Sequence, residues 1–253
     1  MVRKNKKITA GILIIGNEIL SGRTKDQNVS ILASWLNDNI GIKIEEVRIV
    51  PDVEKKIIKN TLDLTKKYNY VFTTGGIGPT HDDITAKSIS KAFKKKYTYH
   101  KEAFEILKKY YGFKSFNGPR KKMSKMPEGS SLVYNPSSAA PGFIIKNVIC
   151  LPGVPSILKS MLNNLKKYLK PGLKIYSQTI SGQTVESSIA FILEKIQKKY
   201  KKYVDVGSYP FFRLGKIGVS VVIRSENKIR LQSCHNEIVK MFKKKEIKIF
   251  QGS

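Results

Sequence analysis

Residues 71–85 read VFTTGGIGPTHDDIT, and this stretch is the most informative part of the chain for the fold. A short apolar run ends in a glycine-rich turn, two carboxylates follow, and a helical pattern starts after them. Glycine lets the backbone close around an anionic group because it has no Cβ to block the approach. Bare N–H groups and the N-terminus of the next helix favour a phosphate at such a turn.

The adjacent acids Asp82 and Asp83 place negative charge where a phosphate is expected. The pairing makes chemical sense if a divalent cation lies between the carboxylates and the phosphate oxygens. The alternative is that one of the two acids caps the helix that begins near Thr85. The glycine spacing fits neither the dinucleotide fingerprint nor the P-loop. The turn therefore predicts phosphate or metal binding without matching either of these motifs.

Strand-like and helix-like stretches alternate on both sides of this turn. Aliphatic runs predict strands at 8–15, 42–50 and 70–74. Amphipathic patterns predict helices at 26–39, 52–67, 84–93 and 100–110. The alternation favours a parallel sheet with helices on both faces and ligands at the carboxyl ends of the strands. Gly16 and Thr74 both follow such strand ends, so we expect their loops to share one crevice.

The second half of the chain contains shorter elements and the best domain boundary. Residues 112–130 are basic and irregular; short strands are predicted at 132–134, 143–145 and 148–151, and a helix at 156–169. The sequence Lys170-Pro171-Gly172 then divides a domain of residues 1–170 from a smaller one of residues 171–253. The smaller domain has a β-α-β-β-α pattern. It lacks a GxxG loop between helices, which disfavours RNA binding of the KH type.

The net charge of +28 comes from 47 basic and 19 acidic residues, and it raises the question of a polyanionic partner. Because lysines are spread along the whole chain, we interpret them as a solvated surface, and we expect no specific nucleic-acid partner. No apolar run reaches the roughly 18 residues of a membrane span. Cys150 and Cys234 lack a CxxC partner, so we expect buried thiols in the cytoplasm.

Several polar residues near the strand ends have both a structural and a functional interpretation. In the first loop, Asn17, Glu18 and Ser21 are candidates for ligand or metal contact, and Asp26 is a candidate helix N-cap. Asp52 is more simply a cap for the helix at 52–67, although it also lies where a strand meets a helix. No zinc-hydrolase or serine-nucleophile motif occurs.

Six motifs occur in an order that resembles the N-terminal part of the CinA (competence/damage-inducible protein A) family. They are Gly16-Asn17-Glu18-Ile19-Leu20-Ser21-Gly22 with Asp26-x-Asn28, Val50-Pro51-Asp52, Thr74-Gly75-Gly76-Ile77-Gly78-Pro79-Thr80-x-Asp82-Asp83-x-Thr85, Ala140-Pro141-Gly142-Phe143 and Leu151-Pro152-Gly153-Val154-Pro155. This family is grouped with the MoaB/MogA molybdopterin-binding fold, and a similar domain is fused to eukaryotic FAD synthases. The resemblance covers essentially the whole chain.

The resemblance implies a three-layer α/β/α domain with a mostly parallel sheet, followed by a small α+β domain. It implies a site for a nucleotide or pterin, with molybdopterin as one possible ligand. The substrate-binding residues that it implies are Gly16, Asn17, Glu18, Ser21, Gly22, Asp26, Asn28, Thr74, Gly75, Gly76, Gly78, Pro79, Thr80, Thr85, Pro141, Gly142, Pro152 and Gly153. It also implies a homo-oligomer. CinA proteins often carry a deamidase domain, which is not expected in this chain.

Our functional hypothesis is metal-dependent hydrolysis of a nucleotide pyrophosphate of the ADP-ribose or FAD type. Asp82 and Asp83 would bind Mg²⁺, Mn²⁺ or Co²⁺, and Asp52 and Asp83 would be the catalytic acids. Two alternatives remain. One is a molybdopterin- or nucleotide-binding protein that transfers an adenylyl group or performs no catalysis. The other is a nucleic-acid-associated factor that depends on the positive charge.

Overall fold

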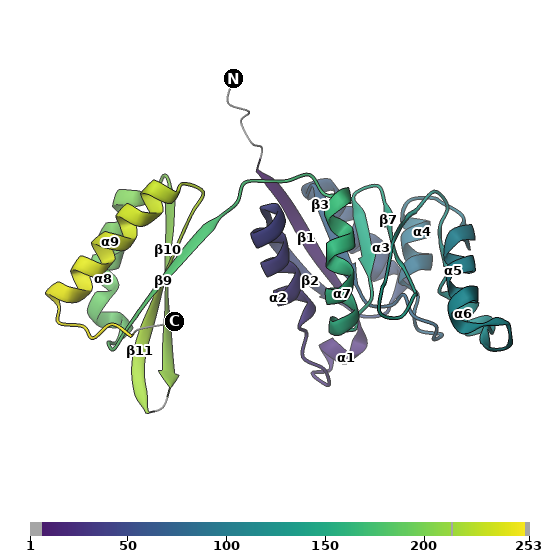
Figure 1. Ribbon diagram of the computed structural model, residues 1–253, viewed down its shortest axis with the longest axis horizontal. Helices are drawn as coiled ribbons and strands as arrows, with labels where there is room; N and C mark the ends of the chain where they lie inside the picture. Colours follow the sequence, from purple (N-terminus) through teal and green to yellow (C-terminus); the bar gives the residue numbers. More distant parts are fainter. Residues whose placement is uncertain (1–6, 214, 251–253) are drawn as a thin grey trace, which may run out of the picture. The chain divides into compact units, whose positions relative to one another are not determined.

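The computed structural model describes residues 7–213 and 215–250 (Figure 1). The chain forms two compact units, Met1–Leu173 and Lys174–Ser253, whereas the sequence suggested a boundary after Lys170. Each unit has its own sheet and its own buried core. No helix in the described residues is long and apolar enough to cross a lipid bilayer.

The first unit is built on a six-stranded sheet in the order β2-β1-β3-β8-β7-β6. The strands are β1 (Ile8–Ile15), β2 (Ile42–Val50), β3 (Tyr70–Thr74), β6 (Ser131–Val133), β7 (Gly142–Ile145) and β8 (Val148–Leu151). The four strands β2, β1, β3 and β8 run parallel to one another, and β7 and β6 add an antiparallel edge. The expected mostly parallel sheet is therefore confirmed.

Helices cover both faces of this sheet, which makes three layers (Figure 1). Along β1, Ile12 and Ile14 point into the core shared with α2 (Asn28–Trp35) and α7 (Pro155–Leu165). Leu13 and Ile15 point to the opposite core, which is shared with α3 (Glu54–Lys67), α4 (Thr85–Ala92) and α5 (Lys101–Tyr111). Burial on both faces explains why β1 is almost continuously aliphatic.

The structure contains short elements that the sequence patterns did not predict. They are α1 (Asn17–Leu20), β4 (Tyr97–Tyr99), η2 (Phe113–Ser115), α6 (Gly118–Lys122) and β5 (Lys125–Pro127). The predicted helices 26–39 and 156–169 end instead in the π-helical turn η1 (Leu36–Ile40) and the 3₁₀ turn η3 (Lys166–Tyr168). β4 and β5 pair as an antiparallel ladder of their own. The segment 112–130 is therefore more regular than expected.

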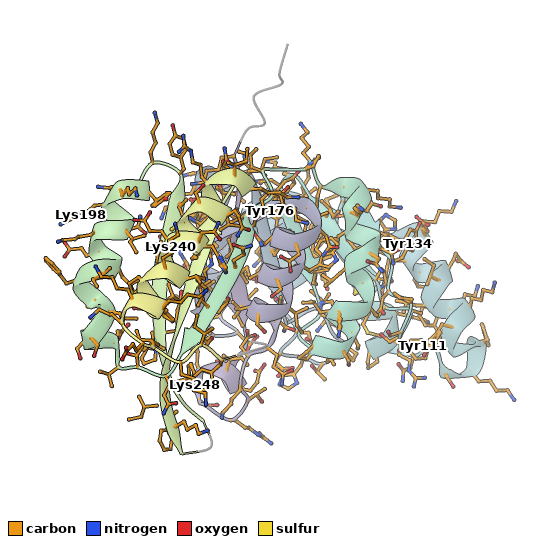
Figure 2. All side chains as sticks on the ribbon, turned by 60° about the vertical axis from the view of Figure 1, so that its left-hand side comes forward. Tyr111, Tyr134, Tyr176, Lys198, Lys240 and Lys248 are labelled. Carbon is orange, nitrogen blue, oxygen red and sulfur yellow. The ribbon has the colours of Figure 1, made fainter. Side chains whose placement is uncertain are left out.

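The second unit has the predicted β-α-β-β-α order. Its elements are β9 (Tyr176–Gly182), α8 (Glu186–Tyr200), β10 (Val204–Arg213), β11 (Lys216–Ser225) and α9 (Lys228–Lys244). The sheet is antiparallel in the order β10-β11-β9. Val219, Val221 and Ile223 of β11 point to one side and pack with α8 and α9. Lys198 and Lys240 lie on these two helices (Figure 2).

The buried ring of Phe72 gives a direct test of the core of the first unit. Phe72 is completely buried, so Phe72→Ala should lower the free energy of unfolding of this unit by about 3–5 kcal/mol. Urea denaturation followed by fluorescence reports on this unit, because Trp35 is the only tryptophan of the chain. The control is Phe113→Ala, whose ring is 88% exposed and whose loss should change stability by less than about 0.5 kcal/mol. Equal losses in both variants would contradict this description of the core.

Candidate functional site

The turn after β3 is shaped by close backbone contacts at two glycines. Gly75 has φ +97°, and a Cβ placed on it would lie 2.2 Å from the Ile15 carbonyl oxygen. Gly76 has φ +67°, and its Cβ would lie 2.2 Å from the Thr85 hydroxyl oxygen. Both positions therefore require glycine for two reasons, backbone conformation and space.

The carboxylates after the turn do not cap the following helix. α4 begins after Ile84, and no side chain accepts a hydrogen bond from its first turn. Instead, Asp83 Oδ2 accepts hydrogen bonds from the backbone N–H of Thr80 at 2.8 Å and from its hydroxyl at 2.5 Å. The capping interpretation of these acids is therefore wrong. Asp83 orders its own loop and keeps its other carboxylate oxygen for further contacts.

The simplest interpretation of Asp52, as a cap of α3, is also wrong. The residue before α3 is Val53, and α3 has no side-chain cap. Asp52 Oδ2 instead accepts a hydrogen bond of 2.9 Å from the backbone N–H of Asn17, at the carboxyl end of β1. Asp52 thus joins the loops that follow β2 and β1, which local sequence alone did not indicate.

The electrostatic environment of Asp52 favours its neutral form. Burial is the main reason why the pKa of this carboxyl is raised, and the hydrogen bond from Asn17 opposes the shift. The negative charges of Glu18, Asp82 and Asp83 raise the pKa further. The pKa of the exposed Asp82 is instead lowered, with the nearby Thr80 side chain as the largest cause, although the hydrogen bond of that hydroxyl is made to Asp83. Three other acids therefore act on Asp52 in a chain that is strongly basic overall.

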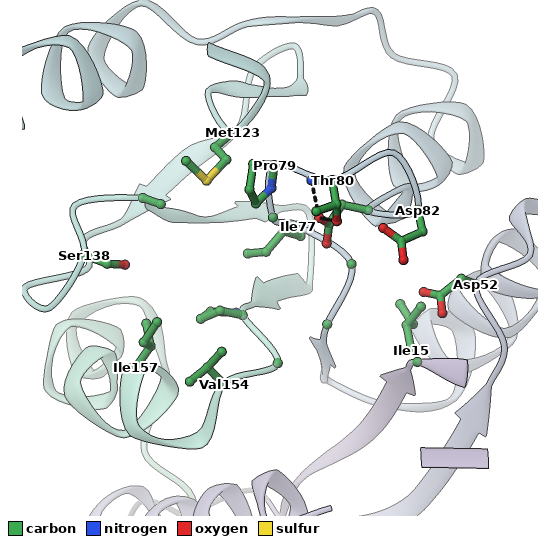
Figure 3. A pocket seen from close by; sticks show the side chains of 18 of the residues that line it. Ile15, Asp52, Ile77, Pro79, Thr80, Asp82, Met123, Ser138, Val154 and Ile157 are labelled. Atoms are coloured by element: carbon green, nitrogen blue, oxygen red, sulfur yellow. Dashed lines mark hydrogen bonds between the residues drawn. The ribbon is translucent and has the colours of Figure 1, made fainter. Parts of the chain in front are cut away.

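A cavity of about 550 Å³ opens at the carboxyl ends of β1, β3 and β8 (Figure 3). Thirteen of the predicted site residues line it: Gly16, Glu18, Asp52, Gly75, Gly76, Gly78, Pro79, Thr80, Asp82, Asp83, Pro141, Pro152 and Gly153. The two loops that were expected to share a crevice do so.

Other predicted site residues support the cavity from behind its wall. Thr85 donates its hydroxyl to the Gly75 carbonyl at 2.9 Å, and its N–H bonds the Gly76 carbonyl. Asn28 donates its side-chain amide to the Gly153 carbonyl at 2.7 Å. Asp26 accepts a hydrogen bond from the Val29 N–H in the first turn of α2, but the N-cap position itself is Gln27, one residue later than predicted. The remaining ones are Asn17, Ser21, Gly22, Thr74 and Gly142, which are not among the lining residues.

The cavity also has lining residues that were not predicted as site residues, although Ile77, Ala140, Val154 and Pro155 belong to the motifs quoted above. They are Ile15, Thr24, Ile77, Met123, Asn135, Ser138, Ala140, Val154, Pro155 and Ile157. The sequence offered a clue to Asn135, because this residue lies in a polar turn between two predicted strands. In the structure its side-chain oxygen accepts hydrogen bonds from the N–H groups of Ser137 and Ser138. The sequence offered no such clue to Met123, since it reaches the cavity from a separate segment after α6.

The cavity has two chemically different ends (Figure 3). Asp52 and Asp82 lie on one side of the view, and Met123, Val154 and Ile157 lie on the other. Among the described residues, the N–H groups of Gly76, Ile77 and Gly78 have no acceptor, whereas the Gly75 N–H donates to Leu151 at 3.1 Å. Free donors and acids at one end, with an apolar wall at the other, suit a molecule that combines a ring with a phosphate.

The acids form a partial set of metal ligands. Residues 7–213 and 215–250 contain no group of three or more His, Cys, Asp or Glu side chains arranged to hold a metal ion. The available donors are carboxylate oxygens, which are the type that Mg²⁺ and Mn²⁺ prefer. Because Mg²⁺ is commonly held by one or two carboxylates together with substrate phosphates, Asp82 and Asp83 fit a cation that binds with its substrate.

Comparisons with known proteins identify the family. A family model described as "probable molybdopterin binding domain" matches residues 11–171, and one described as "FAD synthase, middle domain" matches residues 174–251. The chain belongs to the molybdopterin-binding-domain family. Within it, the chain is of the CinA type, which confirms the resemblance seen in the sequence motifs.

Individual relatives agree with this assignment. A protein of Archaeoglobus fulgidus is 32% identical over 219 residues, which cover 87% of this chain and 92% of the relative. A CinA-like protein of Fusobacterium nucleatum is 39% identical over 160 residues, which cover 63% of this chain but only 40% of that longer protein. The crystal structure of CinA from Thermoplasma acidophilum matches with a TM-score of 0.60 and 31% identity, covering 64% of this chain and 98% of that one.

The charge coupling at the acidic end can be tested by removing one neighbour of Asp52. Glu18→Gln removes a negative charge that raises the pKa of Asp52, so this pKa should fall. Carboxyl NMR titration measures it, with Asp52→Asn identifying the resonance. The control Glu45→Gln removes the same charge from the middle of β2 and should leave the Asp52 pKa unchanged. An unchanged pKa in Glu18→Gln would show that the two carboxylates are not coupled.

Proposed function

We propose that this protein hydrolyses the phosphoanhydride bond of a nucleotide pyrophosphate of the ADP-ribose or FAD type. The observation that carries the proposal is the meeting of Asp52, Asp82 and Asp83 with the glycine turn in one cavity of about 550 Å³. Such a volume lies within the usual range of small-molecule sites. The acids gather at the end where free backbone donors are available for phosphate oxygens.

The two ends of the cavity suggest how such a substrate binds. The N–H groups of Gly76, Ile77 and Gly78 would donate to phosphate oxygens and stabilise the charge that develops there. The adenine or pterin ring would lie against the apolar wall that includes Met123, Val154 and Ile157.

Asp82 and Asp83 would hold a divalent cation against the pyrophosphate. When bound, this cation would neutralise phosphate charge and make the leaving group a weaker base. The loop is already arranged for this role, because Thr80 fixes Asp83 through two hydrogen bonds while Asp82 stays exposed. We propose that this cation is Mg²⁺, Mn²⁺ or Co²⁺.

Asp52 would act as the general base. A water molecule attacks one phosphorus atom, its proton moves to Asp52, and the bond from phosphorus to the bridging oxygen breaks. AMP leaves together with the second phosphorylated fragment. The raised pKa of Asp52 makes it a better proton acceptor than an exposed aspartate, while the hydrogen bond from Asn17 holds its carboxylate in place.

The comparisons support a nucleotide or pterin ligand, which is a less specific statement than the proposed hydrolysis. The match of residues 174–251 to the middle domain of FAD synthase relates the second unit to nucleotide chemistry. The match of residues 11–171 equally supports the second candidate, a molybdopterin-binding protein that transfers an adenylyl group or performs no catalysis. Tight, metal-independent binding without product would favour this second candidate.

We also propose that the protein forms a homo-oligomer, as the family resemblance implies. A further part of the proposal is that the protein acts in the cytoplasm. Cys150 and Cys234 are free and buried, as expected for thiols in a reducing compartment. Burial raises the pKa of Cys150 to about 12 and that of Cys234 to about 11, so both thiols stay protonated and unreactive at neutral pH.

Turnover tests the proposal directly. The full chain is incubated with ADP-ribose, FAD and related dinucleotides plus Mg²⁺, Mn²⁺ or Co²⁺, and AMP release is measured by chromatography. Asp83→Asn should lower the rate by at least about a hundredfold, because it removes a charge needed for the cation. Asp38→Asn is the control, since Asp38 is an exposed carboxylate whose hydrogen bond comes from its neighbour Asn37. Full activity of Asp83→Asn would refute the role of this acid, and no AMP from any substrate would favour the binding protein.

The pH dependence tests the role of Asp52. A general base must be ionised, so kcat/KM should fall as the pH drops through the pKa of Asp52. Because this pKa is raised, the fall should occur at higher pH than for an ordinary aspartate, and Glu18→Gln should move it to lower pH. An acidic limb that stays in place in Glu18→Gln would show that another group is the base.

A further inference from the structure

The basic segment after α5 is folded onto an aromatic cluster. The Arg120 guanidinium donates to the Ser115 carbonyl at 2.6 Å and lies 4.2 Å from the centre of the Tyr111 ring, at the end of α5 (Figure 2). The rings of Phe104 and Phe116 meet edge to face with centres 4.8 Å apart. These contacts fix α6, so its side chains have defined positions rather than forming a loose charged run.

The last two lysines of α6 have different partners. The Lys121 ammonium lies 5.7 Å from the centre of the Phe116 ring, within the aromatic cluster. The Lys122 ammonium instead donates a hydrogen bond to the Thr80 carbonyl, in the loop that carries Asp82 and Asp83. The next residue, Met123, lines the cavity. Lys122 therefore brings a positive charge from α6 to the acidic end of the site.

Lys122 adds a second donor to a Thr80 carbonyl that Asp83 already bonds. The N–H and hydroxyl of Thr80 donate to the Asp83 carboxylate, and its carbonyl accepts from the Asp83 N–H at 3.2 Å and from the Lys122 ammonium. An ammonium has three donors. Within the described part of the chain, Thr80 is the single hydrogen-bond acceptor of Lys122, which leaves two donors for a ligand. The charge of Lys122 acts on Asp82 as well.

We propose that Lys122 binds a phosphate oxygen of the substrate while it stays anchored to the Thr80 carbonyl. The assignment rests on the proposed function, because it deepens the same site. The glycine turn would bind the phosphates through backbone donors, and Lys122 would add a positive charge that is held at this loop by its bond to Thr80. A lysine suits this role because it binds phosphate as a compact point charge. Lys122 thus selects substrates by their phosphate charge.

Binding of ADP in the presence of excess Mg²⁺ tests the assignment, with isothermal titration calorimetry on the full chain. Lys122→Met keeps the aliphatic stem and removes the charge, and it should weaken ADP binding by about tenfold or more, the loss expected for one charge-assisted hydrogen bond. Lys122→Arg keeps the charge and should lie between Lys122→Met and the wild type. Thermal unfolding of each variant verifies that the fold is retained.

The matched control is Lys109→Met. Lys109 is an exposed lysine near the end of α5, so its loss changes the net charge by the same amount away from Thr80. Its affinity for ADP should stay within twofold of the wild type. The assignment is overturned if Lys122→Met binds ADP like the wild type, or if Lys109→Met loses as much affinity, since the general positive field would then account for the effect.

The outcomes separate this inference from the proposed function. Wild-type protein that binds ADP through Lys122 but cleaves no dinucleotide would contradict the hydrolase and support the lysine assignment. AMP release that depends on Asp83, with Lys122→Met unchanged in ADP affinity, would support the hydrolase and overturn the assignment. Failure of the wild type to bind ADP would overturn both the lysine assignment and the phosphate site at the glycine turn.

Discussion

The site depends on one close backbone approach, at Gly75. A Cβ on Gly75 would lie 2.2 Å from the Ile15 carbonyl oxygen, and a Cβ on Gly153 would lie 3.3 Å from the Gly75 Cα. The Gly75 N–H also bonds the Leu151 carbonyl. The chain segments after β1, β3 and β8 therefore meet at a point where no side chain fits. Because β1, β3 and β8 are parallel, their loops open to the same edge of the sheet and enclose one cavity.

The second constraint is electrostatic. Burial and then the charges of Glu18, Asp82 and Asp83 raise the pKa of Asp52, so each of these acids disfavours the ionised Asp52 carboxylate. A chain with a net charge of +28 has many lysines available, yet Lys122 is the lysine that the described structure bonds to this loop. A concentration of like charge in a cavity is typical of a functional site, where a ligand or cation offsets the repulsion. The surrounding positive field favours the approach of an anionic ligand.

Much of the fold follows from the sequence because the buried strands are aliphatic and the glycines mark their ends. The predicted strands 42–50, 70–74 and 148–151 coincide with β2, β3 and β8. β4 and β5 were missed because they have three residues each, which is too short for a period to show: β4 is Tyr-Thr-Tyr and mostly exposed, and β5 is Lys-Met-Pro with a buried Met126. The glycine turn and its acids were found in the sequence because they are contiguous. The partners of Asp52 and Asp83 were not, since local capping competes with the bonds they make. Asp52 bonds Asn17, which only the tertiary fold brings near, whereas Asp83 bonds Thr80 within its own loop.

The site therefore consists of two parts, and the backbone part is easier to find in the sequence than the chemical part. The backbone part is dictated by Gly75 and Gly76, whose conformations leave no other choice of residue, and it would serve a pterin or a nucleotide phosphate equally well. The chemical part comes from side chains on separate elements: Asp52 after β2, Asp83 before α4 and Lys122 at the end of α6. A fold of this kind can host several reactions, so function is argued from those side chains rather than from the shared turn. In our proposal, Asp52 and Asp83 decide whether the protein binds or hydrolyses its ligand, while Lys122 would contribute to the recognition of phosphate in either case.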